Sequence, residues 1–196
     1  MSVKIEGLSK SFGKKKILTD LSLTFPDTGI YVIRGESGAG KTTLLRIIAG
    51  LDKDYTGKVE LSAKGVSVCF QEYRLFENIT ALKNVTEVSF KNATDADVER
   101  AKALFRRLNL SDEDSALYPA ELSGGMKQRV AFIRAVAKES DILILDEPTK
   151  EVDPENAAIM RQIIKEESEK RLVIMVTHKD EDVSDILSTV IDISAR

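Results

Sequence analysis

Residues 35–43 read Gly35-Glu36-Ser37-Gly38-Ala39-Gly40-Lys41-Thr42-Thr43. They match the pattern G-x-x-x-x-G-K-[ST], between an apolar run at Ile30–Arg34 that predicts a strand and a run at Lys41–Ala49 that predicts a helix. Glycines let backbone N–H groups close around phosphate oxygens, and the helix N-terminus adds positive potential there. The stretch therefore predicts a phosphate-binding loop. An ordinary glycine-rich turn would explain the glycines but not Lys-Thr at this offset.

Two side chains of this loop have the chemistry that nucleotide phosphates require. We expect the Lys41 ammonium to reach the β- and γ-phosphates and the Thr42 hydroxyl to bind Mg²⁺. We expect the other members of the loop to surround the phosphates. These are Gly35, Glu36, Ser37, Gly38, Ala39, Gly40 and Thr43.

Two adjacent carboxylates follow the apolar run Ile142–Leu145, which has the pattern of a buried strand. Because nucleotides bind at the carboxyl ends of strands in open α/β sheets, Asp146 and Glu147 are expected to face the phosphate loop. Asp146 would hold Mg²⁺ through water, and Glu147 would act as general base toward the attacking water. The alternative is a solvated Asp-Glu turn before Pro148.

The rest of the chain alternates strand and helix patterns around a helical middle. Further strands are expected at Val3–Leu8, Leu18–Phe25, Lys58–Leu61, Val66–Phe70, Leu172–Thr177 and Val190–Ile193. The first two flank a turn at 13–16, which predicts an N-terminal antiparallel β subdomain. Residues from about 75 to 140 are expected to form a helical lobe, with Thr94 capping one helix, and another helix is expected from about 154 to 169. The alternation indicates an α/β fold with a mainly parallel sheet.

Composition narrows the possible partners. The 196 residues include 29 basic and 32 acidic side chains, a net charge of −3, so no electrostatic footprint for nucleic acid is present. No apolar stretch approaches the length that spans a bilayer, which leads us to expect a cytoplasmic protein. The single cysteine, Cys69, lies in an apolar run and is expected to be a buried core residue.

A second motif identifies a family. Residues 122–129 read Leu122-Ser123-Gly124-Gly125-Met126-Lys127-Gln128-Arg129 and resemble the signature motif of ABC (ATP-binding cassette) ATPases. The resemblance extends over essentially the whole chain. It implies one nucleotide-binding domain over 1–196, with a P-loop NTPase core of the RecA-like type, and it implies ATP and Mg²⁺ as ligands.

The resemblance also assigns roles across a dimer. Ser123, Gly124 and Gly125 would contact the γ-phosphate of the nucleotide held by a second copy of the cassette, and the amides at a helix N-terminus suit that task. Asp153, which ends the segment after the acidic pair, would take part in the same cross-subunit site. Ser123 and Asp153 also have a structural interpretation as helix starts, and both roles can hold.

Three further residues match family positions in chain order. Phe12 looks like the aromatic residue that stacks on adenine, although a lone Phe in a hairpin could also belong to the core. Gln71 looks like the glutamine that senses Mg²⁺ and the γ-phosphate. His178, the only histidine, resembles the switch histidine that contacts the γ-phosphate and catalytic water, whereas alone it would be a structural residue.

The sequence departs from the family pattern at two places. The fifth signature residue is usually Gln and here is Met126. The segment after the acidic pair usually reads Ser-Ala-Leu-Asp, whereas here it reads Lys150-Glu151-Val152-Asp153. The family pattern therefore does not predict the cross-subunit contacts around these residues.

The resemblance implies an ATP-hydrolysing motor subunit on the cytoplasmic face of a membrane, where a transmembrane permease would dock near Gln71–Phe76. Met126 with residues 70–75 and 78–85 looks like the ATPases of nitrate and sulfonate importers, which also use a solute-binding protein. An exporter, a lipoprotein-releasing system and a non-transport ABC ATPase remain alternatives.

Overall fold

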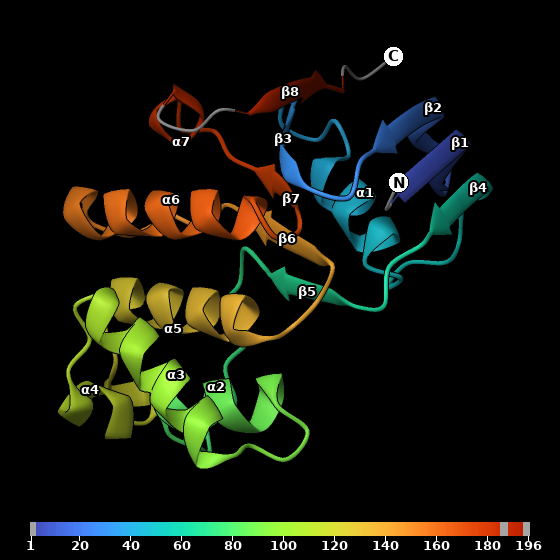
Figure 1. Cartoon of the computed structure of the whole chain (residues 1–196). Helices are drawn as coiled ribbons and strands as arrows, with labels where there is room; N and C mark the ends of the chain where they lie inside the picture. The colour runs from blue at the N-terminus through green and yellow to red at the C-terminus, as the bar shows by residue number, and fades with distance from the viewer. Residues whose placement is uncertain (1–2, 185–187, 194–196) are drawn as a thin grey trace. The chain divides into compact units, whose positions relative to one another are not determined.

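The computed structural model describes residues 3–184 and 188–193, which form two compact units. The first unit is built from the described residues of Met1–Val68, Ser140–Asp146 and Lys165–Arg196. The second comprises Cys69–Glu139 and Glu147–Ile164. Figure 1 labels the elements of each unit.

A five-stranded sheet with the order β5-β6-β7-β3-β8 carries the first unit. Its strands are β3 (Gly29–Arg34), β5 (Val66–Cys69), β6 (Ile142–Asp146), β7 (Leu172–Val176) and β8 (Thr189–Asp192). The pairs β6–β7, β7–β3 and β3–β8 are parallel. Every residue of β6 and β7 is buried, as expected of central parallel strands with both faces covered.

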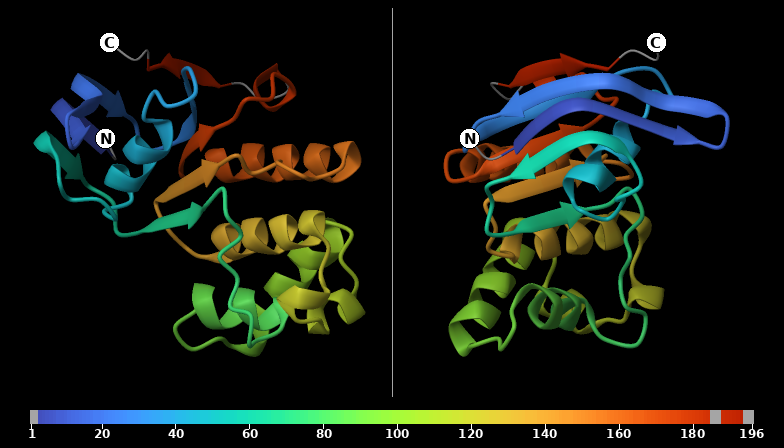
Figure 2. Two further views of the ribbon diagram at one scale, coloured as in Figure 1. Left: turned by 180° about the vertical axis from the view of Figure 1, so that it is seen from behind. Right: turned by 90° about the vertical axis from the view of Figure 1, so that its right-hand side faces the viewer.

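A second sheet of the first unit is antiparallel, with the order β2-β1-β4. It contains β1 (Val3–Phe12), β2 (Lys15–Phe25) and β4 (Thr56–Leu61), and the long β1–β2 hairpin is visible in the right-hand view of Figure 2. The turn expected at 13–16 is shorter than predicted, because Lys15 pairs with Phe12 and Lys16 with Ser11. Cross-strand pairing thus continues through two lysines whose side chains remain in solvent.

Helix α1 (Lys41–Ile48) packs against β6 and β7 and closes the core of the first unit. Its apolar residues recur with helical spacing, and Leu44, Leu45, Ile47 and Ile48 are buried. The core continues under the antiparallel sheet through Val3, Ile5, Leu8 and Phe25. The short helix α7 (Glu181–Ser184) follows β7.

The second unit is helical. It contains α2 (Ala81–Ser89), α3 (Asp95–Arg107), α4 (Asp112–Ala116), the 3₁₀ turn η1 (Pro119–Glu121), α5 (Gly124–Ala137) and most of α6 (Pro154–Ser168). Thr94 caps α3 as predicted: its hydroxyl accepts a hydrogen bond from the Asp97 amide, and the Asp97 carboxylate accepts one from the Thr94 amide. Helix α5 is buried along most of its length and packs against α2 and α3.

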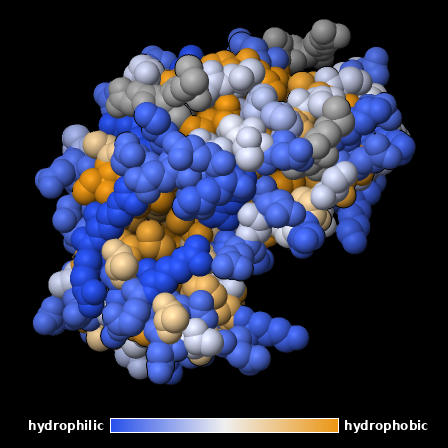
Figure 3. Space-filling model, viewed as in Figure 1, coloured by the Kyte–Doolittle hydropathy of each residue, from blue (hydrophilic) through white to orange (hydrophobic). Residues whose placement is uncertain are grey.

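The predicted α/β class, with a mainly parallel sheet and an antiparallel N-terminal sheet, is confirmed, and so is the burial of Cys69. Among the described residues, no helix has both the length and the apolar character that a membrane crossing needs. Hydrophilic residues cover much of the face drawn in Figure 3.

Gly57 and Gly13 form a matched pair for testing the antiparallel sheet. Both have positive φ, +94° and +59°. A Cβ at Gly57 would lie 2.4 Å from the Gly7 carbonyl oxygen, whereas one at Gly13 would meet nothing within 4 Å. We expect Gly57→Ala to lower the free energy of unfolding by about 3 kcal/mol and Gly13→Ala by about 1 kcal/mol. Urea unfolding measures both, and equal losses would contradict the close approach of β1 and β4.

Candidate functional site

The predicted phosphate loop lies in the first unit, between β3 and α1. Gly40 caps α1 in the left-handed region, with φ of +90°. A Cβ there would lie 2.6 Å from Ile17 Cγ2 and 2.9 Å from Leu18 Cδ2, so β2 leaves no room for a side chain. Glycine at this position therefore allows the loop to turn tightly against β2 and present backbone amides at the start of α1.

The Lys41 and Thr42 side chains are fixed by hydrogen bonds within this unit. The buried Lys41 ammonium donates to the carbonyl oxygens of Gly35 at 2.8 Å and Glu36 at 2.9 Å, which curls the loop around it. The Thr42 hydroxyl donates to Asp146 Oδ2 at 3.0 Å. The two sequence motifs, more than a hundred residues apart, therefore meet in one cluster.

Asp146 is buried at the carboxyl end of β6, with 4% of its surface exposed. Burial raises the pKa of Asp146, and the Thr42 hydrogen bond and the charges of Lys41 and His178 only partly oppose this effect. No cluster of three or more His, Cys, Asp or Glu side chains suited to a metal occurs among the described residues. The hydroxyl–carboxylate pair nevertheless fits Mg²⁺, which prefers oxygen ligands, needs few from the protein and keeps several waters.

His178 is exposed in the turn that follows β7. The turn is fixed by Thr177, whose hydroxyl donates to the fully buried Asp182 at 2.8 Å and accepts from the Lys179 amide at 3.1 Å. Sequence reasoning did not single out Thr177 or Asp182. A hydroxyl residue directly before the histidine, with a carboxylate one turn later, is the signal that could have found them.

Phe12 ends β1 and exposes 56% of its surface, so it is not a core residue. The alternative that this phenylalanine belongs to the core is wrong. An aromatic ring left in solvent at a strand end is available for stacking on a planar ligand.

The signature residues begin helix α5 of the second unit. Ser123 is its N-cap, and the serine hydroxyl accepts a hydrogen bond from the Met126 amide at 3.2 Å. A Cβ on Gly124 would lie 2.9 Å from Glu151 Oε2, and one on Gly125 would lie 2.9 Å from the Glu151 carbonyl oxygen. The two glycines thus leave space for the segment in which this sequence departs from the family pattern.

A tyrosine binds the same carboxylate oxygen of Glu151 that lies against Gly124. The Tyr73 hydroxyl donates to Glu151 Oε2 at 2.5 Å, and this bond raises the pKa of Tyr73 to about 12. Arg134 of α5 donates to the carbonyl oxygens of Tyr73 and Arg74 at 2.8 and 2.6 Å. Helix α5 and Glu151 therefore both hold Tyr73, and helix α5 also holds Arg74.

Two more buried polar residues of α5 hold loops of the second unit, and sequence reasoning missed both. Gln128 donates to the Pro148 carbonyl oxygen at 2.9 Å and more weakly to that of Glu147 at 3.5 Å. Arg129 donates to the Leu108 carbonyl oxygen at 2.6 Å. Burial lowers the pKa of Arg129, although a guanidinium remains charged. Both side chains thus donate from α5 to backbone carbonyl oxygens of other segments.

The remaining candidates of the second unit differ in their surroundings. Glu147 is half-buried with φ of +54°, a conformation that costs energy for a residue with a Cβ. The Asp153 carboxylate accepts hydrogen bonds from the Asn156 amide and side chain, both at 2.9 Å, which lower the pKa of Asp153 and start α6. Gln71 is exposed. The structural interpretation of Ser123 and Asp153 as helix starts is thus confirmed.

The structure gathers the candidates in two groups. In the first unit, Lys41, Thr42 and Asp146 lie together, and His178 is close enough for its charge to act on Asp146. In the second unit, the signature glycines lie against Glu151.

Sequence comparisons find a family and relatives for this chain. A family model described as "ABC transporter" matches residues 18–150. The chain is 35% identical to the sulfate/thiosulfate import ATP-binding protein CysA of Escherichia coli strain K12, over 99% of this chain and 58% of that protein. It therefore spans less than two thirds of the length of this relative. It is 38% identical to the aliphatic sulfonates import ATP-binding protein SsuB of Corynebacterium glutamicum, over 94% of this chain and 75% of that one.

A solved structure is similar as well. The dimeric, post-hydrolysis structure of the ATP-binding cassette MJ0796, bound to ADP and Pi, superposes with a TM-score of 0.80 at 27% identity. The similarity covers 92% of this chain and 89% of that one.

The raised pKa of Asp146 predicts a pH-dependent cost of folding. When the pKa of a carboxyl group is higher in the folded than in the unfolded protein, the free energy of unfolding falls as pH rises through the folded pKa. Asp146→Asn removes that cost and can still accept the Thr42 hydrogen bond. We expect this variant to unfold at higher urea concentration than the parent at pH 7, with a gain that shrinks toward pH 4, near the pKa of about 3.9 in unfolded chains.

Glu77→Gln, at an exposed loop position, is the control. A pH-independent loss of stability in Asp146→Asn would contradict a folding cost that arises from the buried charge.

Proposed function

Because the chain belongs to the ABC transporter family, we propose that it binds ATP and hydrolyses it to ADP and phosphate to drive transport. The observation that carries the proposal is the hydrogen bond between Thr42 and Asp146 beside the buried ammonium of Lys41. Two oxygen atoms suited to a cation and one ammonium lie at the N-terminus of α1, and this supports the proposal because a helix N-terminus favours phosphate.

Thr42 and Asp146 would hold Mg²⁺, with Gln71 as a further ligand, and the ion would neutralise charge on the β- and γ-phosphates. Lys41 would exchange its bonds to the loop carbonyls for bonds to phosphate oxygens. Gly35, Glu36, Ser37, Gly38, Ala39, Gly40 and Thr43 would line the phosphates. Phe12 would stack on adenine.

Hydrolysis needs a base and a group that orients the attacking water. Glu147 would accept the proton of the water as it attacks the γ-phosphorus and the bond to ADP breaks. His178 would contact the γ-phosphate and the same water, and Gln71 would sense the ligand. The firm turn under His178, with Thr177 bonded to Asp182, favours this assignment, because a positioning group must be held.

A second copy of the chain would complete the site. Ser123, Gly124 and Gly125 at the start of α5 would meet the γ-phosphate held by the partner, with Asp153 in the same interface. The dimeric state of MJ0796 supports this proposal. The Glu151 carboxylate beside Gly124 means that the cross-subunit site of this chain would contain an anion where the usual family residue is neutral.

The partner that uses the ATP energy would be a transmembrane permease docking at 71–76, where Phe76 exposes 54% of its surface. The chain would then lie on the cytoplasmic face of the membrane. We infer import of a small solute, with a solute-binding protein in the same system, because the similar proteins CysA and SsuB are import ATP-binding proteins. An exporter or lipoprotein-releasing ATPase is the second candidate.

The Glu147→Gln variant tests the ATPase proposal. Without the general base, turnover should fall by about 10²- to 10⁴-fold while ATP still binds, because the phosphate loop is unchanged. Steady-state phosphate release and ATP titration measure the two effects. With ATP the variant should also elute as a dimer in size-exclusion chromatography, and without ATP as a monomer. Turnover near that of the parent would remove Glu147 from the base role.

The Phe76→Cys variant tests the permease contact. Cys69 is the only native cysteine and is buried, so the new residue supplies the one accessible thiol of the chain. Cross-linking in native membranes should capture a multi-spanning membrane protein through Phe76→Cys. Glu113→Cys, at an exposed position of α4, is the matched control and should capture none. Capture of soluble proteins alone at position 76 would favour the non-transport alternative.

A further inference from the structure

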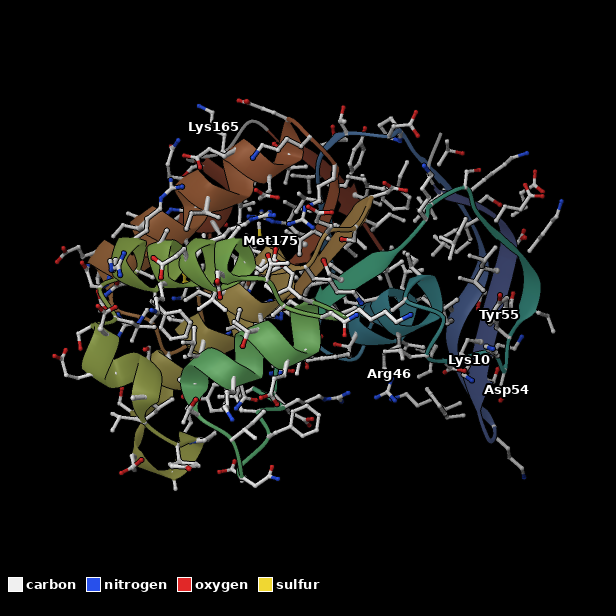
Figure 4. All side chains as sticks on the ribbon, turned by 60° about the horizontal axis from the view of Figure 1, so that its bottom comes forward. Lys10, Arg46, Asp54, Tyr55, Lys165 and Met175 are labelled. Atoms are coloured by element: carbon white, nitrogen blue, oxygen red, sulfur yellow. The ribbon has the colours of Figure 1, made fainter. Side chains whose placement is uncertain are left out.

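A buried lysine lies two residues before Phe12 on strand β1. Lys10 exposes 4% of its surface, and its ammonium donates hydrogen bonds to Asp52 Oδ1 at 2.9 Å and Asp54 Oδ2 at 3.2 Å. A third bond goes to the Asp54 carbonyl oxygen. Figure 4 shows Lys10 beside Asp54, which belongs to the loop after α1. All three protons of the ammonium thus have acceptors.

The ammonium keeps its charge at this position. Burial alone would lower the pKa of Lys10, but the hydrogen bonds and charges of Asp52 and Asp54 outweigh burial, and the pKa of Lys10 lies above its ordinary value. Asp52 is itself mostly covered, with 17% of its side chain exposed. Lys10 is therefore a fixed cation rather than a mobile surface lysine.

This cation lies over the ring of Phe12. The Lys10 Nζ is 4.9 Å from the ring centroid, within the range of a cation–π contact. The ring nevertheless exposes more than half of its surface. The Lys10 ammonium thus contacts one face of the Phe12 ring, while the ring remains accessible to a ligand.

We propose that Lys10 is a positioning residue for the adenine base, acting through Phe12. The inference rests on the proposed ATP binding and extends it. An ammonium on one face of an aromatic ring fixes the ring plane and draws electron density toward itself. The opposite face then repels the electron-rich face of a stacked purine less strongly. Lys10 would strengthen base stacking without touching the nucleotide.

A purely structural role is the competing explanation. Lys10 also joins β1 to the loop that contains Asp52 and Asp54, and its loss could loosen that loop without any effect through Phe12. The two explanations differ in one respect. Only the positioning role requires that the effect of Lys10 on ATP binding vanish when the Phe12 ring is absent.

The test is a double-mutant cycle with Lys10→Met and Phe12→Ala in the full chain. Affinities for ATP and for inorganic tripolyphosphate, which has no base, are measured for each variant by titration calorimetry. Lys10→Met should weaken ATP binding about three- to tenfold in the parent and have no further effect in Phe12→Ala. Tripolyphosphate affinity should stay unchanged, and kcat at saturating ATP should stay near that of the parent.

Two further variants serve as a substitute and as a control. Lys10→Gln keeps hydrogen-bonding groups toward Asp52 and Asp54 without the charge, and it replaces Lys10→Met if that variant does not fold. Lys4→Met is the matched control, because Lys4 lies on the same strand with 43% of its side chain exposed, and it should leave both affinities unchanged.

The outcomes separate the inference from the proposal on which it rests. An equal loss of ATP affinity from Lys10→Met with and without Phe12, or no loss, would overturn the positioning role. If Phe12→Ala weakens ATP binding in that case, the ATPase proposal stands. Failure of the parent chain to bind ATP would overturn both.

Discussion

Parallel packing of β3, β6 and β7 is the constraint on which the first unit depends, and its result is the hydrogen bond from Thr42 to Asp146. This bond joins the start of α1 to the end of β6, and its formation requires that β6, β7 and β3 run parallel and end at the same edge of the sheet. The apolar residues of these strands fill the core and fix their register, because a slip by one residue would reverse which side chains face α1. Packing of ordinary aliphatic side chains thus brings a hydroxyl and a carboxylate together from distant parts of the sequence.

In the second unit, polar side chains of one helix bring distant segments together. Gln128, Arg129 and Arg134 are buried on α5, and their donors reach carbonyl oxygens in three different loops. A helix buried on most sides would ordinarily be apolar all round. Here the buried donors hold three loops, and two of these loops contain or adjoin candidate residues: the one with Tyr73 follows Gln71, and the one with Pro148 follows Glu147. Loss of these buried donors would break hydrogen bonds away from solvent, which is costlier than the loss of an exposed bond.

Much of this arrangement could be predicted, and the reason differs from element to element. The phosphate loop, the strand before Asp146 and the Thr94 cap are set by local sequence, so spacing and residue type suffice. The buried state of Lys10 and Arg129 could not be predicted, because a charged residue is exposed by default and its acceptors come from other segments. The Tyr73–Glu151 bond joins residues 78 apart, and Glu151 lies in the segment where the chain departs from its family pattern. The longer hairpin was not predicted because Gly13 and the charged run after it indicate a solvated turn, whereas pairing with β1 decides the conformation of Lys15 and Lys16.

Several costs of the folded state lie beside the proposed chemistry. Asp146 is a carboxylate whose pKa burial raises, and the next residue, Glu147, adopts positive φ. Glu151 also has positive φ where it lies against the signature glycines. These features destabilise the chain and persist only because the surrounding core and the donors of α5 fix the adjacent backbone. A cation bound by Asp146 would remove its electrostatic penalty, since the charged carboxylate is then the favoured form. Ligand binding is thus expected to stabilise the folded chain by removing the electrostatic penalty at Asp146.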